Sequence, residues 1–292
     1  MKKPSLLLLI IPLLFVWFMP GCDGDSSDEA DADHPFAGKT LELFVGSASK
    51  PATQEAATEF EKATGANLEI HFGGSGAMLS QMKLVERGDL YFPGSSDFME
   101  KAKQEGLVLP DTERRVVYLI PAINVPNDNP AHIKSLEDLA RPGVRIGIGR
   151  PDTVCVGLYA VEVLDRAGLS DEVKSNIVTE AESCAKTAQL VSLDLVDAIL
   201  GWRVFTYWDP ENIQTILLQP SQVPRIGYIP IAISKFCENE KLAAAFIDFL
   251  LSPQGKAIFA KWHYLTTIEE ARELTDSDTP VGGEWQLPEE WK

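Results

Sequence analysis

The chain has 292 residues, with 26 Lys and Arg against 43 Asp and Glu, and its formal net charge is −17. A chain this negative is not expected to bind nucleic acid. A small site within it can still be locally positive and bind an anion. The four cysteines and four histidines form no CxxC motif and no Cys/His cluster, so we expect neither a structural zinc site nor a resident cofactor.

The first 21 residues have the pattern of a secretory leader. Two lysines precede an apolar run at 6–18 that is short for a membrane span, and no later run is long or apolar enough to span a bilayer. The following MPGC motif resembles a bacterial lipobox, which predicts cleavage before Cys22 and lipidation of that residue. A plain secretory signal is the alternative. Residues 1–21 are therefore expected to be a signal peptide and 22–38 a flexible acidic tether.

Strand-like and helix-like segments then alternate along the chain. Hydrophobic periodicity predicts strands at 40–46, 67–72, 90–92, 116–125, 144–149, 177–181, 196–202, 211–218 and 228–234. It predicts helices at 52–63, 77–87, 96–105, 156–167, 184–192, 239–251 and 253–262. Ser135 to Asp138 is similar to a capping box. The alternation indicates an α/β fold with a mainly parallel sheet covered by helices, and a chain that crosses to a second lobe and returns.

The stretch FGGSGAMLSQM at 72–82 places glycines between a predicted strand and a predicted helix. It has no lysine where a P-loop needs one, and Leu79 stands where a dinucleotide fingerprint needs its third glycine. Two interpretations of Ser75 remain. The residue either caps its own helix, or it belongs to an anion site with the free N–H groups of the helix start.

Further turns of this kind follow other strands. Residues 46–51, GSASKP, also end a strand and open a helix, and 150–157 repeats the arrangement later in the chain. Another helix is predicted to begin at Ser183 and Cys184. Since open α/β sheets bind ligands at the carboxyl ends of their strands, helix starts from two lobes could close on one small anion.

Several segments in this order and spacing resemble the periplasmic molybdate-binding proteins of ABC transporters, which are type II solute-binding proteins. The segments are LELFVGSASKPATQEAATEFEKATG, FGGSGAMLSQM, GDLYFPGSSDFMEKAKQEGLV, IKSLEDLARPGVRIGIGRPDTVCVGLYAVEVLDRAGL and AFIDFLLSPQGKAIFAKWHY. The resemblance covers about 41–265 without large gaps.

This resemblance implies two α/β lobes joined by two crossing strands, with the ligand in the cleft. Lobe 1 would comprise 39–121 and 229–265, lobe 2 would comprise 122–228, and 266–292 would form an appended acidic tail with a short helix at 267–274. The implied function is capture of molybdate or tungstate, without catalysis, and delivery to membrane permease subunits and their ATPase. The protein is then expected to be a monomer on the periplasmic or extracytoplasmic side, held at the membrane by the lipid on Cys22.

The family holds its oxyanion with serine hydroxyls, backbone N–H groups and one aromatic hydroxyl. The resemblance assigns one ligand-binding serine to Ser75 and the other to Ser47 or Ser49. The choice between the last two is open because this first turn is one residue longer than in the best-known members. The two serines of the first turn therefore stay as alternatives.

The remaining family positions fall in lobe 2. The backbone donors fall near Val156 and Cys184, and the family tyrosine falls on Trp202, whose indole N–H can donate but cannot accept. Cys155 and Cys184 either form a disulfide that fixes two anion-binding turns or are two small buried residues.

Two alternatives remain, one in the same class of receptors and one in the class of enzymes. A receptor of the same fold could take sulfate, phosphonate, a small organic anion or ferric ion, although the six tyrosines contain no adjacent pair of the kind that iron receptors commonly use. An enzyme with Ser75 as nucleophile would need a base, and Gly-Gly-Ser-Gly is not the Gly-x-Ser-x-Gly motif.

Overall fold

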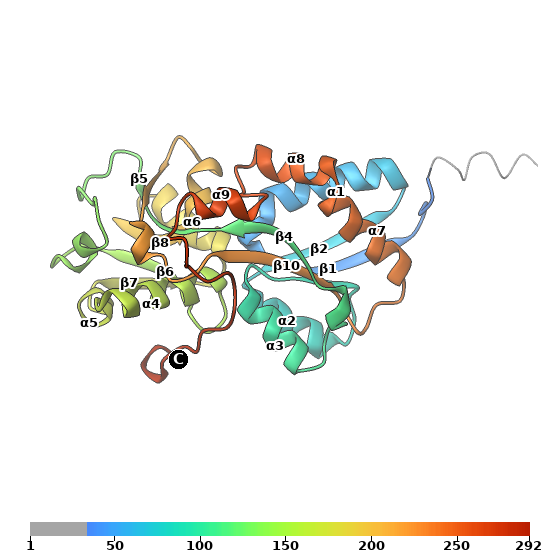
Figure 1. The fold of residues 1–292 in the computed structure, drawn as a ribbon, viewed down its shortest axis with the longest axis horizontal. Coiled ribbons are helices and arrows are strands. Elements are labelled where there is room, and N and C mark those ends of the chain that lie inside the picture. Colours follow the sequence, from blue (N-terminus) through green and yellow to red (C-terminus); the bar gives the residue numbers. More distant parts are fainter. Residues whose placement is uncertain (1–33) are drawn as a thin grey trace, which may run out of the picture.

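A computed structural model describes residues 34–292, and its ribbon is shown in Figure 1. The predicted signal peptide, the lipidation site at Cys22 and most of the tether lie outside the described residues. Among residues 34–292 no single helix is long and apolar enough to cross a membrane. The bent pair of helices Glu240–Leu251 and Pro253–Lys261 passes that test only when the two are taken together.

The strands follow the predicted order closely. They are β1 Thr40–Gly46, β2 Asn67–Gly73, β3 Leu90–Phe92, β4 Arg114–Leu119, β5 Pro121–Pro126, β6 Ile146–Gly149, β7 Ile177–Ala181, β8 Ala198–Trp202, β9 Ile213–Leu217 and β10 Gly227–Ile233. The helices are α1 Lys50–Thr64, α2 Ser75–Val85, α3 Ser96–Gln104, α4 Cys155–Ala167, α5 Ser170–Lys174, α6 Cys184–Ser192, α7 Glu240–Leu251, α8 Pro253–Lys261 and α9 Ile268–Arg272.

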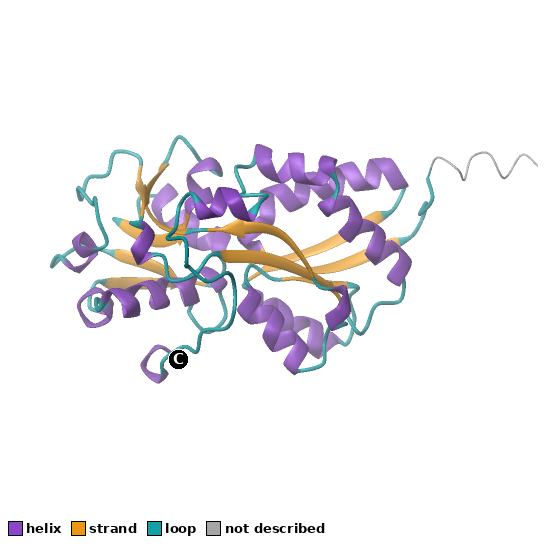
Figure 2. Cartoon of the chain, in the orientation of Figure 1, coloured by secondary structure: helices purple, strands orange, loops and turns teal. Residues whose placement is uncertain are grey.

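The first sheet has the strand order β2-β1-β3-β10-β4. β1 runs parallel to β2 from the Thr40/Asn67 pair to the Gly46/Gly73 pair, and it also runs parallel to β3. β10 is antiparallel to both of its neighbours. Helices α1, α7 and α8 cover one face of this sheet and α2 and α3 cover the other (Figures 1 and 2). We call this part of the molecule lobe 1.

The second sheet has the order β7-β6-β8-β5-β9. β6 is parallel to β7 and β8, while β5 is antiparallel to β8 and β9. This sheet with its helices, among them α4, α5 and α6, is lobe 2. Each sheet thus keeps a parallel group of strands, and the carboxyl ends of these strands open toward the other lobe. The two-lobed α/β fold expected from the sequence is confirmed, with mixed sheets.

The apolar run at 116–125 is not one strand, as the sequence predicted, but two. Residues up to Leu119 pair with β10 in lobe 1, and residues from Pro121 pair with β8 and β9 in lobe 2. Periodicity alone could not find this break, because the chain stays buried on both sides of it. The chain returns through the segment between β9 and β10. These two passages are the connections at which the lobes would hinge.

The predicted capping box at Ser135 is also wrong. The residues form a short 3-10 helix, Glu137–Ala140, whose N-cap is Leu136 without a side-chain cap. The carboxylate of Asp138 instead accepts hydrogen bonds from the backbone N–H groups of Lys134 and Ser135, at 2.8 and 3.1 Å. Only the backward half of a capping box is therefore present.

Candidate functional site

Four helices begin where strands end, and these starts face one another across the two lobes. In lobe 1, the short 3-10 helix Ser47–Ser49 leads from β1 into α1, and α2 follows β2. In lobe 2, α4 follows β6 and α6 follows β7. The positive ends of these helix dipoles therefore point toward a common space, which is a favourable surrounding for an anion.

The lobes touch at this place through backbone and hydroxyl hydrogen bonds. The N–H of Ala185 in α6 donates to Ser47 Oγ at 3.1 Å, and the N–H of Gly76 in α2 donates to the carbonyl of Thr153 at 2.8 Å. A Cβ on Gly74 would lie 2.7 Å from the carbonyl oxygen of Glu182. The structure therefore has the lobes in a closed arrangement, with the four helix starts in contact.

Ser75 does not cap its own helix. The N-cap of α2 is Gly74, which makes no side-chain cap, and the buried Ser75 Oγ accepts the N–H of Gly94 at 3.0 Å. The carbonyl of Ser75 accepts a hydrogen bond from the hydroxyl of Tyr91 at 2.8 Å. Since the hydroxyl oxygen accepts from Gly94, its proton can donate, and in this closed arrangement it donates to the Cys155 thiol. The cap interpretation of Ser75 is thus contradicted.

The two serines of the first turn have different surroundings. Ser47 Oγ accepts from Ala185 of lobe 2 and so faces the space between the lobes. Ser49, the N-cap residue of α1, accepts at its Oγ from the hydroxyl of Thr53 in the first turn of that helix at 2.9 Å. Both serines are buried. Geometry therefore brings Ser47 together with the start of α6, and it places Ser49 inside lobe 1.

Cys155 and Cys184 meet at the lobe 2 side of the same space. They are the first residues of α4 and α6, both are buried free thiols, and their Sγ atoms lie 3.3 Å apart. Burial and the neighbouring Cys184 raise the pKa of the Cys155 thiol well above its ordinary value, although hydrogen bonds from Ser75 and from the Val156 N–H act to lower it. The Cys155 sulfur therefore lies where these donors converge.

Trp202 ends β8 and is fully buried, and its Nε1 has no hydrogen-bond partner within the described residues. Its indole packs edge-on against the ring of Tyr159, with centroids 4.9 Å apart. The hydroxyl of Tyr159 is also buried without a partner among those residues. A buried polar group without a partner is costly and calls for an explanation, such as a bound water or ion.

Sequence reasoning missed two contributors. Gly94, whose N–H holds Ser75, lies in a turn after β3, and a Cβ there would stand 2.4 Å from Cys155 Sγ. The available signal was PGSS at 93–96, a third turn of the same kind after a strand of lobe 1. Tyr159 has no comparable signal, because an aromatic residue inside an apolar helix is usually a core residue.

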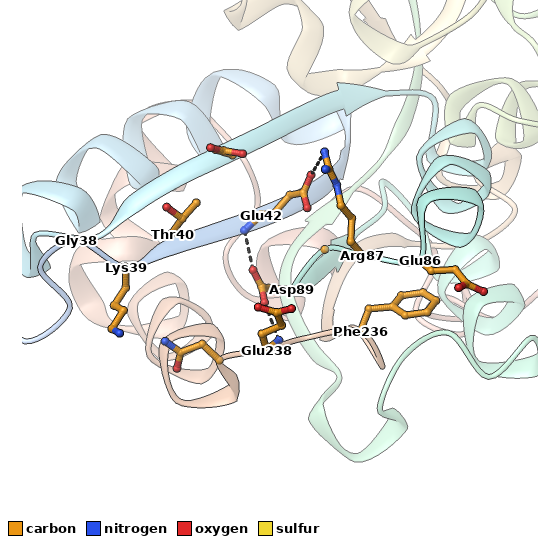
Figure 3. Close-up of a pocket in the computed structure, with 12 residues that line it drawn as sticks. Gly38, Lys39, Thr40, Glu42, Glu86, Arg87, Asp89, Phe236 and Glu238 are labelled. Atoms are coloured by element: carbon orange, nitrogen blue, oxygen red, sulfur yellow. Dashed lines mark hydrogen bonds and ion pairs between the residues drawn. The ribbon is translucent and has the colours of Figure 1, made fainter.

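A hollow of about 580 Å³ lies elsewhere, at the amino end of β1. Figure 3 shows Glu42, Glu86, Asp89 and Glu238 around it, with Arg87 contacting Glu42 at 3.2 Å. The N–H of Glu42 donates to Asp89 Oδ2 at 2.8 Å. These carboxylates would repel an anion, and the strands of the cleft end on the opposite edge of the sheet. The place where the helix starts of the two lobes meet is thus the better candidate for an anion.

Comparison with known proteins gives consistent results. The family model for bacterial extracellular solute-binding proteins matches residues 41–265. The molybdate-binding protein ModA of Escherichia coli (strain K12) is 23% identical over 235 residues, which cover 77% of this chain and 88% of that protein. A protein of Bacillus subtilis (strain 168), named as the ABC transporter substrate-binding lipoprotein YvgL, is 24% identical over 265 residues, or 90% of this chain and 98% of that protein.

Solved structures of molybdate-binding proteins share this fold. The solved structure of the periplasmic molybdate-binding protein of Azotobacter vinelandii is similar with a TM-score of 0.68 at 19% identity, and the match covers 78% of this chain and 99% of that one. The chain belongs to the family of bacterial extracellular solute-binding proteins. This is a class of transport receptors and not a class of enzymes.

Proposed function

We propose that this receptor binds molybdate or tungstate in the space between its lobes and passes it to an ABC permease with its ATPase. The observation that carries the proposal is the convergence of neutral donors from both lobes. Ser47 and Ser75 come from lobe 1. The start of α4 and the indole N–H of Trp202, which has no partner among residues 34–292, come from lobe 2. Of the two alternatives in the first turn, we favour Ser47.

The chemistry suits a fully ionised oxyanion. Each hydrogen bond to a charged acceptor contributes about 1.5–3 kcal/mol, so several of them can outweigh the ordering of two lobes. Trp202 donates but does not accept, and the backbone N–H of Val156 and Cys184 at the helix starts likewise only donate. An anion that carries a proton near neutral pH, such as phosphate, would find few acceptors. Size would separate molybdate from sulfate.

Location and assembly belong to the same proposal. We propose that the chain is a monomer anchored by a lipid on Cys22, with the acidic segment after it as a tether. The similarity to a B. subtilis protein named as a lipoprotein supports the anchor. Mass spectrometry of the mature N-terminus would test it, because an acylated Cys22 has a mass distinct from a plain signal-cleavage product.

Elemental analysis tests the ligand directly. We expect protein purified from its native host without refolding to carry up to one molybdenum or tungsten atom per chain. Protein from cells grown without either metal serves as the control and should carry none. Folded protein that never carries either element, even from cells supplied with both, would count against the proposal.

A further inference from the structure

Arg225 is a buried cation in the segment that returns from lobe 2 to lobe 1. Its side chain is 4% exposed, its Nε lies 2.7 Å from the carboxylate of Glu162, and its Nη2 lies 2.9 Å from that of Asp97. Asp97 is in the first turn of α3 in lobe 1, whereas Glu162 is on α4 in lobe 2. One guanidinium therefore joins a helix of each lobe at the place where the chain crosses between them.

The same side chain contacts the candidate ligand site through one aromatic residue. The guanidinium of Arg225 stacks over the ring of Tyr159 at 4.1 Å from its centroid. That ring packs on Trp202, whose indole N–H is the proposed ligand donor. The interlobe ion pair and the ligand site are thus separated by a single layer of packed side chains.

Residues 280–292, which we call the C-terminal strap, run beside this crossing. The N–H of Ile226 donates to the carbonyl of Pro280 at 2.8 Å, and the N–H of Gly282 donates back to the carbonyl of Ile226 at 2.8 Å. Gly282 and Gly283 have φ of 65° and 89°, a region that glycine tolerates and that turns the strap here. The strap (dark red in Figure 1) crosses the middle of the molecule.

On lobe 1, the strap is held by the first turn of α3. The hydroxyl of Ser96 and Nη1 of Arg225 both donate to the carbonyl of Gly283 at 2.8 Å, and the N–H of Trp285 donates to Asp97 Oδ1 at 3.0 Å. The carboxylate of Asp97 therefore receives hydrogen bonds from the crossing segment and from the strap together.

On lobe 2, the end of the strap is held by Lys174 at the end of α5. The ammonium group of Lys174 donates to the carbonyl of Glu290 at 2.5 Å and lies 4.5 Å from the ring centroid of Trp291, which is itself buried. The strap thus contacts both lobes. It lies beyond residue 265, where the match to the family model ends.

We propose that Arg225 and the C-terminal strap form an interlobe latch that holds the closed cleft and slows ligand release. Arg225 is a positioning residue, since it acts through Tyr159 and through closure rather than by contact with the ligand. Opening would draw Asp97 away from Arg225 and the strap, and breaking a buried ion pair is costly. The effect on ligand release rests on the function proposed above, whereas the effect on closure does not.

Asp97→Asn tests the latch because it removes the charge while keeping the shape of the side chain. Ser96→Ala removes one tie to the strap. Glu100→Gln is the matched control, since Glu100 is on the same helix but pairs with Lys103, three residues along that helix. Each full-length variant is measured by small-angle X-ray scattering without ligand and by stopped-flow release of molybdate. Thermal unfolding confirms that each variant is folded.

We expect Asp97→Asn to enlarge the radius of gyration of the ligand-free protein and to raise the release rate of molybdate about tenfold. Ser96→Ala should shift both quantities in the same direction by a smaller amount, and Glu100→Gln should leave both unchanged. Folded Asp97→Asn and Ser96→Ala variants whose scattering and release match those of the wild type would overturn the latch. If the wild type binds no oxyanion at all, the scattering of the ligand-free variants still tests the latch. In that case only the proposed ligand is refuted.

Discussion

Ser75 illustrates what one residue's neighbours in sequence can and cannot show. A serine between glycines before a helix is typical of an N-cap, and the local pattern predicts that role. In the structure its hydroxyl instead accepts the N–H of Gly94, nineteen positions away in the chain. No local rule contains this contact, because it depends on β3 lying beside β1 in the sheet. The resemblance to a known family assigns Ser75 to the ligand site, which stays a prediction.

Ser75→Ala is therefore expected to weaken molybdate binding by more than tenfold. The change removes one charge-assisted hydrogen bond and leaves the N–H of Gly94 without its partner. Isothermal titration calorimetry measures the affinity. Ser80→Ala is a suitable control, since Ser80 is on the same helix and is exposed. An affinity unchanged by Ser75→Ala would show that this hydroxyl is only structural.

The cysteines give a second prediction at this scale. The closed lobes bury the thiols of Cys155 and Cys184, and burial raises the pKa of Cys155, so little reactive thiolate forms near neutral pH. If ligand stabilises closure, adding molybdate should slow alkylation of this pair by iodoacetamide about tenfold or more. Peptide mass spectrometry measures the rate at each site.

Cys237 is the internal control for that experiment. It is only partly buried and lies outside the cleft, and burial together with Asp89 raises its pKa to about 12. Its slow alkylation should not depend on molybdate. Equal alkylation of Cys155 with and without ligand, in protein that is shown to bind it, would contradict a thiol-lined closing cleft.

At the scale of elements, the sequence predicted most of the fold. Strands such as β1 and helices such as α1 follow their predicted ranges because each has a strong period and a clear end, as at Gly65, which closes α1 with φ of 72°. The prediction of one strand at 116–125 was wrong because the residues on both sides of the break are buried, which hides the change from one sheet to the other. Which helix starts meet across the lobes depends on the tertiary fold, and periodicity carries no information on it.

The contact between helix starts leads to a prediction about Gly74. Its φ of −66° and ψ of 143° suit alanine, but a Cβ would lie 2.7 Å from the carbonyl oxygen of Glu182 and 3.0 Å from that of Thr153, both in the backbone of lobe 2. Gly74→Ala should therefore obstruct closure and weaken ligand binding at least tenfold. It should leave the unfolding temperature of the ligand-free protein almost unchanged.

Gly73→Ala is the matched control for that variant. A Cβ at Gly73 meets the flexible end of Met78, in the same lobe, at 2.7 Å. This contact can relax without moving the lobes, so the affinity should stay close to that of the wild type. Equal affinities for the two variants would mean that the start of α2 does not approach lobe 2 in the ligand-bound state.

At the scale of the whole molecule, the C-terminal region differs most from what the sequence indicated. The sequence predicted an acidic, proline-containing tail with one short helix at 267–274, and α9 confirms that helix. Yet Trp291 is buried, and Ala271 of α9 is fully buried in the second hydrophobic cluster of the molecule. The apolar residues of 266–292 are too few and too irregular to show a period. Their packing depends on contacts with the folded lobes, which the local sequence does not show.

The central claim is that the closed cleft binds a tetrahedral oxyanion. It rests on the two lobes, on the two chain passages that would act as a hinge, and on the neutral donors in the cleft. Isothermal titration calorimetry of folded, ligand-free protein with molybdate and tungstate tests it most directly, with sulfate and phosphate as competitors. We predict saturable binding of one molybdate or tungstate per chain that a large excess of sulfate or phosphate does not displace. The absence of binding by either metal oxyanion would contradict the claim.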